Sequence, residues 1–197
     1  QLEYEGVWNI VTPRGRPWLE LIENEKTQEI RRQARCSAIG APRAKWRLSD
    51  GRLWLVSLFR CGGDIKLETV YGGNGEPILA EWITADLVTQ RGKTLCRPRY
   101  GGAGILETTI FIKVERGVVT HIAEGSNLNH PAIPTVESLR KLFGPKDAHM
   151  AEELVSDWPC LDEYTLRQLR GEPSAAPPKG STYGEYLNDH ARKLLTQ

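Results

Sequence analysis

The middle of the chain carries the hydrophobic pattern of a β-hairpin. Residues 45–48 alternate between polar and apolar side chains, and residues 53–59 form a nearly continuous apolar run. The residues between them, Ser-Asp-Gly at 49–51, are of the types found in tight turns. A further alternating segment, residues 65–71, follows a second turn, so we expect three strands in meander order.

A second hairpin is predicted further along the chain, with a helix between the two hairpins. Residues 106–114 place every second apolar or threonine side chain on one face, and residues 115–117 supply a turn into a strand over 118–122. Residues 77–88 carry Ile, Leu and Trp near helical spacing. This spacing predicts a helix that covers the sheet.

Helical signals flank the predicted sheet on both sides. The composition of residues 18–35 favours an exposed helix. After Pro131, capping residues and stop signals predict three short helices, over residues 135–143, 148–157 and 163–170. The end of the chain is predicted to form a Pro-rich linker over residues 172–182 and a C-terminal helix over 183–197.

These elements define the predicted fold class. We expect an α+β protein with a mainly antiparallel sheet of about five strands, one packed helix and C-terminal helices. Residues 1–171 form a single domain in this prediction, because the length of 197 residues is close to that of one domain with appended helices.

The charge balance narrows the classes of function. Lys and Arg total 26 against 25 Asp and Glu, a formal net charge of +1, which excludes a uniformly basic protein that coats DNA. The longest apolar stretch, residues 53–59, is far shorter than the roughly 18 residues that a membrane-spanning helix needs. We therefore predict no membrane span.

The cysteine content predicts a cytoplasmic location. The chain has four cysteines and no C-x-x-C pair: Cys36, Cys61, Cys96 and Cys160. Four cysteines are too few for a disulfide scaffold in a chain of 197 residues, which favours buried reduced thiols in the cytoplasm. A single disulfide is the alternative interpretation.

Four cations without an intervening acid form a local basic segment: Arg91, Lys93, Arg97 and Arg99. Gly101 and Gly102 follow, and a glycine-rich loop lets main-chain N–H groups approach a phosphate that neighbouring arginines clamp. The segment is therefore a candidate phosphate- or DNA-binding site, or else an exposed connection. Trp46, flanked by two cations, is a candidate for stacking on a base.

Asp50, Asp64 and Lys66 suggest a second candidate site. Their order resembles that of metal-dependent nucleases of the PD-(D/E)-x-K type, in which the acids hold a divalent cation and the lysine steadies the attacking water. A nuclease would need a metal such as Mg²⁺, and otherwise we expect no cofactor and no metal site. The alternative is structural, because Asp50 also suits a turn.

The central third of the chain resembles accessory proteins of bacterial conjugative plasmids. The resemblance is carried by residues 75–87, by residues 91–95 and by the hairpin through 115–118. It points to the Osa-type fertility-inhibition group, which blocks transfer of the DNA of a co-resident plasmid. This resemblance implies a ParB/sulfiredoxin-like fold with a phosphate-binding G-x-x-R-R stretch at a helix start. Gly40 and Arg43 fit that stretch, and Ala44 occupies its last position.

Three classes of function follow from these features. The favoured hypothesis is a non-enzymatic bacterial accessory protein that acts by binding, as an inhibitor of conjugative DNA transfer. The first alternative is a metal- or nucleotide-dependent nuclease that acts on transferred DNA. The second is an immunity-type protein that binds only a protein partner. The expected partners are a protein, DNA or both, and the sequence leaves the oligomeric state open.

Overall fold

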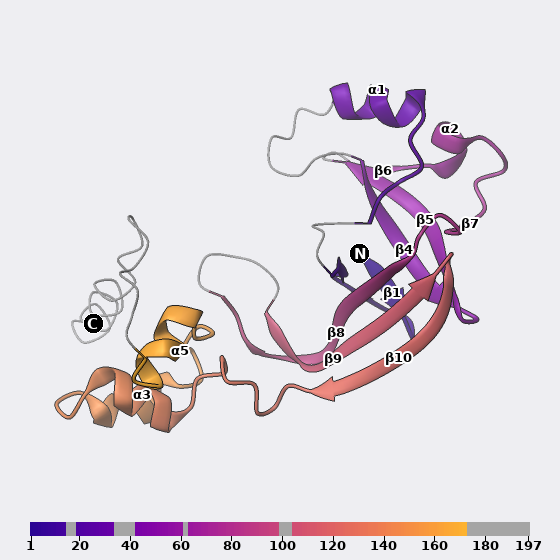
Figure 1. The fold of residues 1–197 in the computed structure, drawn as a ribbon. Coiled ribbons are helices and arrows are strands. Elements are labelled where there is room, and N and C mark those ends of the chain that lie inside the picture. The colour runs from indigo at the N-terminus through magenta and orange to yellow at the C-terminus, as the bar shows by residue number, and fades with distance from the viewer. Residues whose placement is uncertain (15–18, 34–41, 61–62, 99–103, 173–197) are drawn as a thin grey trace. The chain divides into compact units, whose positions relative to one another are not determined.

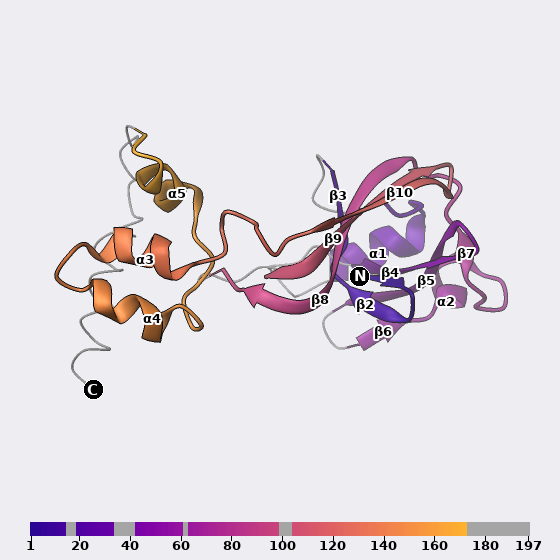
Figure 2. The same cartoon turned by 90° about the horizontal axis from the view of Figure 1, so that it is seen from below.

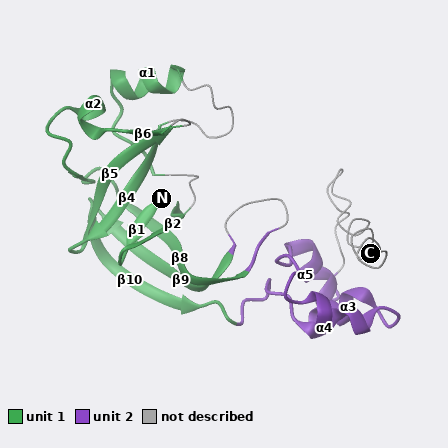
Figure 3. Ribbon diagram, turned by 180° about the vertical axis from the view of Figure 1, so that it is seen from behind, with its two compact units in different colours: residues 1–95, 105–128 green, residues 96–104, 129–197 purple. Residues whose placement is uncertain are grey.

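The structure, a computed structural model, describes residues 1–14, 19–33, 42–60, 63–98 and 104–172 (Figure 1). The chain divides into two compact units, coloured separately in Figure 3. Unit 1 comprises residues 1–95 and 105–128, and unit 2 comprises residues 96–104 and 129–197. The predicted domain of residues 1–171 includes residues of both units. The predicted linker from residue 173 onward and the C-terminal helix lie outside the described residues.

Unit 1 is built around one mixed sheet (Figures 1 and 2). The described strands follow the order β2-β1-β4-β5-β10-β9-β8-β3, and β6 and β7 each pair with β5. Their bounds are β1 Leu2–Tyr4, β2 Val7–Asn9, β3 Thr12–Pro13, β4 Arg43–Ser49, β5 Arg52–Arg60, β6 Gly63–Ile65, β7 Ile78–Leu79, β8 Ala85–Cys96, β9 Ile105–Glu115 and β10 Val118–Ser126. Strand β1 runs parallel to β4, whereas β4 and β5 are antiparallel.

The first fourteen residues bring the two ends of this sheet together. Strands β2 and β3 occupy opposite ends of the strand order, yet only Ile10 and Val11 separate them in the chain. The Thr89 hydroxyl on β8 donates to the Ile10 carbonyl at 2.9 Å, which fixes this short connection. The sheet therefore curls until its ends meet through the N-terminal segment.

The predicted fold class is wrong in its sheet and in its packed helix. The sheet has ten described strands instead of about five, and the β1–β4 pair makes it mixed. Residues 77–88, predicted to be helical, form β7, a turn and the start of β8. In β8 Leu87 and Thr89 are buried while Asp86 is exposed, so the two-residue period of a strand prevails over the helical spacing.

Two helices accompany the sheet among the described residues of unit 1. Helix α1 (Glu25–Gln33) lies within the predicted helix of residues 18–35 and is shorter. Helix α2 (Leu67–Tyr71) replaces most of the strand predicted over residues 65–71. Its buried side chains, Leu67 and Val70, are three residues apart, so they share one helical face.

Both predicted hairpins are confirmed, over β4–β5 and over β9–β10. Each closes through two residues with positive φ: 52° and 67° at Asp50 and Gly51, and 49° and 75° at Arg116 and Gly117. Left-handed conformations at both positions give the turn geometry whose twist matches that of the flanking strands. The turn residues of the sequence therefore set where these strands reverse.

Strands β5 and β9 contribute the largest group of inward-facing side chains to the core of unit 1. The members of these two strands that are almost fully buried are Leu53, Leu55, Leu58, Ile110, Ile112 and Val114. Burial of one such side chain contributes about 1.5–3 kcal/mol. Trp46 is only 2% exposed, with its ring centroid 6.2 Å from that of Trp82. It packs in the core and is not available to stack on a base.

Unit 2 holds the short helices predicted after Pro131. They are α3 (Val136–Phe143), the 3₁₀ turn η1 (Ala148–Met150), α4 (Ala151–Leu154) and α5 (Glu163–Leu169). Two of the predicted caps are confirmed: Thr135 accepts from the N–H of Ser138, and Asp162 accepts from the N–H of Thr165. Asp147 makes no such side-chain contact, and the helix that it was expected to cap is short and irregular.

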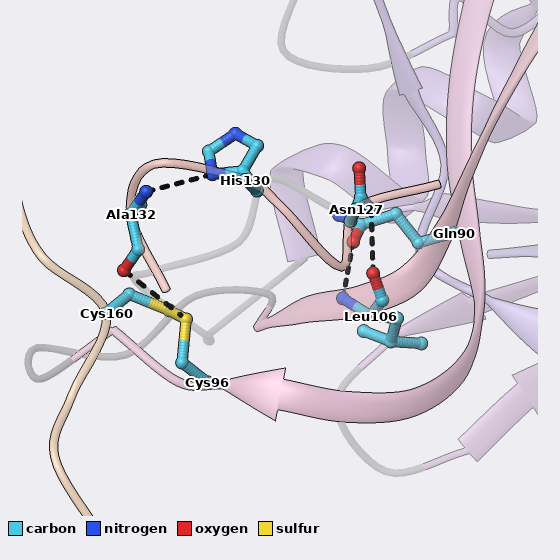
Figure 4. The surroundings of a disulfide bond; sticks show 7 residues. All are labelled: Gln90, Cys96, Leu106, Asn127, His130, Ala132 and Cys160. Atoms are coloured by element: carbon cyan, nitrogen blue, oxygen red, sulfur yellow. Dashed lines mark hydrogen bonds between the residues drawn. A yellow bond between two sulfur atoms is a disulfide. The ribbon is translucent and has the colours of Figure 1, made fainter. Parts of the chain in front are cut away.

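A disulfide in unit 2 joins Cys96 to Cys160, with their Cα atoms 5.1 Å apart (Figure 4). The N–H of Cys160 donates to the carbonyl of Arg97 at 3.0 Å, next to the bond. The prediction of reduced thiols is therefore wrong for these two cysteines, while Cys36 and Cys61 lie outside the described residues. Stable disulfides are rare in the cytoplasm, so the cysteines no longer support the predicted cytoplasmic location.

Candidate functional site

Arg91, the first member of the predicted basic segment, lies between two carboxylates. Its guanidinium on β8 donates to Glu5 at 2.5 Å and to Glu124 at 2.6 Å. Glu5 belongs to the β1–β2 turn and Glu124 to β10, so the arginine connects three segments of unit 1. Two negative charges at hydrogen-bond distance offset its positive charge. Arg91 is therefore poorly suited to attract a phosphate.

Tyr4 belongs to the same cluster. Burial, followed by the charges of Glu5 and Glu124, raises the pKa of Tyr4 above its usual value of 10.0. The phenol is therefore neutral at physiological pH, and the four side chains together carry a net charge of −1. A cluster of this charge holds the N-terminal hairpin against β8 and β10, and it does not form an anion-binding site.

The other members of the basic segment are divided between the two units. Lys93 belongs to unit 1, where it is exposed and its main-chain N–H donates to the carboxylate of Glu107 at 3.0 Å. Arg97 is exposed and belongs to unit 2. Arg99, Gly101 and Gly102 lie outside the described residues. The described part of the segment therefore presents only Lys93 and Arg97 as exposed cations.

The G-x-x-R stretch leads into a strand. Arg43 is the first residue of β4 and pairs with Phe59 of β5, while Gly40 lies outside the described residues. The expected ParB-like stretch would bind phosphate at the start of a helix. Arg43 stands instead at the start of a strand, which provides no helix N-terminus for an anion.

The three residues of the predicted nuclease site do not come together. Asp50 occupies the β4–β5 turn, where the Ser49 hydroxyl donates to its carboxylate at 2.9 Å. Asp64 pairs with Phe59 at the opposite end of β5, and a rise of about 3.3 Å per residue separates the two acids by roughly 20 Å. This separation is far too large for the two acids to hold one metal ion.

The partners of Asp64 and Lys66 are also structural. Asp64 accepts from Lys45 at 2.9 Å, and Lys66 lies 3.7 Å from Glu68 in the first turn of α2. Within the described ranges, no group of three or more His, Cys, Asp or Glu side chains is arranged to hold a metal ion. The acids and the lysine are therefore accounted for by a turn and by surface ion pairs.

Exposed apolar side chains cluster at the N-terminal hairpin. Trp8 is 42% exposed and Ile10, two positions further on, 60%, and we call these two residues the N-terminal apolar patch, whereas Val7, 53% exposed, precedes Trp8 in β2 and points to the opposite face. Trp8 on β2 lies opposite Glu3 on β1, so both side chains point to the same face of the sheet. Glu3 also pairs with Arg47 at 2.7 Å, which places an ion pair beside the indole.

The sequence did not identify this patch as a site. The short β2 strand offers too few residues for its buried and exposed faces to be distinguished. The available signal is the run Trp8-Asn9-Ile10, which places two large apolar residues two positions apart, as on one face of a strand. Large apolar side chains that gather on a surface are typical of interaction sites.

A hollow of about 560 Å³ lies at the turn of the β9–β10 hairpin. It is lined by Glu81, Thr84, Glu115, Arg116, Val118 and Thr120. Two carboxylates and one guanidinium give this lining a net negative charge, which disfavours a phosphate or a nucleic acid. The hollow contains none of the predicted site residues.

Comparisons with known proteins do not identify the class of this protein, so its class is inferred from its fold and its surface. No protein-family model, curated protein or solved structure matches the chain. In the described part of the chain, no helix is long and apolar enough to cross a membrane. The described structure consists of a curled mixed sheet that exposes the N-terminal apolar patch and of a small disulfide-bonded helical unit.

Proposed function

We propose that this chain is a bacterial accessory protein that acts by binding a protein partner through the N-terminal apolar patch. The observation that carries the proposal is the exposure of Trp8 together with that of Ile10. Tryptophan is enriched among the residues that dominate protein interfaces, because one side chain offers a large apolar surface and an N–H donor. The Glu3–Arg47 pair beside it supplies a polar rim.

Electrostatics favour a protein partner over DNA. The net charge of +1 gives no long-range attraction to a polyanion, and Arg91 is neutralised by Glu5 and Glu124. Phosphate contacts supply most of the affinity of DNA-binding proteins, so a surface with few free cations binds DNA weakly. Because the sequence resembles fertility-inhibition proteins, which block conjugative DNA transfer, we assign the partner to the machinery of that transfer.

The disulfide bears on where this binding takes place. Cys96 and Cys160 are bonded, and bonds of this kind persist where the surroundings are oxidising. We replace the predicted cytoplasmic location with action in an oxidising compartment of the cell, such as the bacterial envelope. The partner is then a component of the transfer machinery that is exposed there.

A plasmid-transfer assay tests the proposal. Wild-type protein, expressed in a donor cell, is expected to lower the transfer frequency of a co-resident conjugative plasmid. Trp8→Ala should remove most of this inhibition, because loss of a central interface residue costs about 2 kcal/mol or more, roughly a 30-fold loss of affinity. Trp8→Phe, which keeps an aromatic ring, should retain more of the inhibition.

A charge-reversed variant provides the matched control. Lys93→Glu/Arg97→Glu removes two exposed cations of the described basic segment and is expected to inhibit transfer like the wild type. If this variant no longer inhibited transfer while Trp8→Ala still inhibited it, the protein would act on DNA. Unchanged transfer in the presence of wild-type protein would remove conjugation from the proposal.

A further inference from the structure

Strand β10 has one long open edge. It pairs with β9 from Val118 to Ser126, but its only described pairing with β5 is between Val118 and Arg52. From Thr120 to Ser126 the second edge has no strand partner among the described residues. In Figures 1 and 3 β10 forms the outer margin of the curved sheet.

The main chain of this edge is oriented for further pairing. The N–H of Asn127 donates to the carbonyl of Glu107 on β9 at 2.7 Å, and the β9–β10 register is regular from His121 onward. Because main-chain groups alternate along an antiparallel strand, the N–H and C=O groups of Ile122, Glu124 and Ser126 point away from β9. These groups form the hydrogen-bonding ladder that a further strand would use.

From His121 onward the edge lacks the usual protection against pairing, because the register shift of β10 lies before it, between Val119 and His121. Natural proteins guard free edges with Pro, with Lys or with inward-pointing charges, and residues 120–126 contain neither Pro nor Lys. The one carboxylate on this stretch, that of Glu124, is bound by Arg91. Ile122 is 37% exposed, so an apolar side chain stands next to the open ladder.

The outer face beside this edge is apolar at its centre. Ala123 on β10 lies directly opposite Phe111 on β9, so both point to the same face. Phe111 is 51% exposed, because the small alanine next to it leaves the ring uncovered on the side of the open edge. An added strand with a small residue opposite Ala123 would extend this surface without a steric conflict.

We propose that the occupant of this edge is a second copy of the chain, paired antiparallel through β10 about a two-fold axis at Ala123. Ala123 lies midway between Ile122 and Glu124, so this register pairs the outward-pointing groups of Ile122 on each copy with those of Glu124 on the other. The two sheets join into one, and the outer face then carries the row Phe111, Ala123, Ala123 and Phe111. Each phenyl ring lies against a small residue.

The side chains that face one another in this register are compatible. His121 lies opposite Gly125, Ile122 opposite Glu124, and Thr120 opposite Ser126, so no two like charges are opposed. A net charge of +1 on each copy adds negligible repulsion. The pairing is isologous, as expected for a two-fold dimer, and it does not depend on the function proposed above.

Cross-linking of the full-length protein tests the register. Residues that face each other across a two-fold axis in antiparallel strands have Cα atoms about 4.5–5.5 Å apart, which suits a disulfide. Ala123→Cys is therefore expected to give a covalent dimer on mild oxidation, well above the level of the wild type. Lys113→Cys on β9, one strand further in, is the control, because the two sulfurs would stay about three strand spacings, roughly 14 Å, apart.

Sedimentation velocity provides an independent measurement that does not rely on added cysteines. The wild type should show a reversible monomer–dimer equilibrium, and Ile122→Glu should weaken dimerisation at least tenfold by placing a carboxylate opposite Glu124 of the other copy. Ile22→Glu alters an isoleucine of similar exposure, 40% against 37%, outside β10 and should sediment like the wild type. A monomeric wild type, or a dimer in which Ala123→Cys gives no more cross-linking than Lys113→Cys, would overturn the proposal.

Discussion

Replacement of both bonded cysteines, Cys96→Ser/Cys160→Ser, is expected to lower the free energy of unfolding by about 4 kcal/mol. The bond joins residues 64 positions apart, and a cross-link that closes so long a loop removes much of the entropy of the unfolded chain. The loss should fall mainly on unit 2, because both cysteines belong to it. Urea unfolding followed by far-UV circular dichroism measures the difference.

The surroundings of the disulfide explain why unit 2 depends on it. Leu161 donates to the carbonyl of Ala132 at 2.8 Å, and this carbonyl also lies 3.8 Å from the Sγ of Cys96 (Figure 4). The disulfide and these contacts hold the segments around Cys96, Ala132 and Cys160 next to the carbonyl of Ala132. The core of unit 2 is small, with Leu139, Ala151, Trp158 and Leu161 as its buried members. Small cores are the ones that benefit most from a covalent cross-link.

Peptide mapping under non-reducing conditions supplies the control for this prediction. The wild type is expected to yield a linked peptide pair that contains Cys96 and Cys160. The prediction fails if both thiols are recovered in alkylated form, or if the double variant unfolds at the same urea concentration as the wild type. Either result would also remove the argument for an oxidising compartment.

Gly117→Ala is the second change with a large expected effect. Gly117 has a φ of +75°, and a Cβ atom added there would lie 2.8 Å from the carbonyl carbon and oxygen of Ala80. These contacts are with main-chain atoms, which cannot rotate away as a side chain would. The left-handed conformation costs about 1–2 kcal/mol for alanine and the overpacking a further 1–3 kcal/mol. We therefore expect a loss of roughly 2–5 kcal/mol.

Gly51→Ala separates the two contributions. Gly51 holds the equivalent position of the β4–β5 turn with a φ of +67°, and an added Cβ meets nothing within 4 Å. This variant should lose only the cost of the left-handed conformation, about 1–2 kcal/mol. Equal losses in the two variants, measured by thermal unfolding, would show that the approach of Gly117 to Ala80 carries no strain.

The sequence was informative wherever a local pattern decided the structure. Both long hairpins were predicted, because strand alternation and X-Gly turns lie within a few residues of each other. Residues 77–88 were mispredicted, because Leu79, Ile83 and Leu87 are four residues apart as in a helix, and only the pairing of Leu79 with Trp54 and of Leu87 with Pro13 overrides this spacing. The position of β7 beside β5 is a property of the folded chain that no local window contains.

The candidate sites were less predictable than the hairpins. Asp64 and Lys66 are close in sequence, but their partners are Lys45 and Glu68, and the whole of β5 separates Asp64 from Asp50. The neutralisation of Arg91 by Glu5 joins residues 86 positions apart. Contacts between residues so far apart in sequence do not produce a periodic pattern in a single sequence. The sequence therefore could not show that carboxylates neutralise Arg91 in the basic segment.

The way in which the first fourteen residues join both ends of the sheet has a consequence for the order of folding. Strand β1 pairs with β2 and with β4, and Thr12 in β3 pairs with Val88 in β8, so this segment is completed only by a strand that comes much later in the chain. Pairings between residues so far apart in sequence form late in folding, because a long loop must close first. The surface that we assign to partner binding is therefore among the last parts of unit 1 to form.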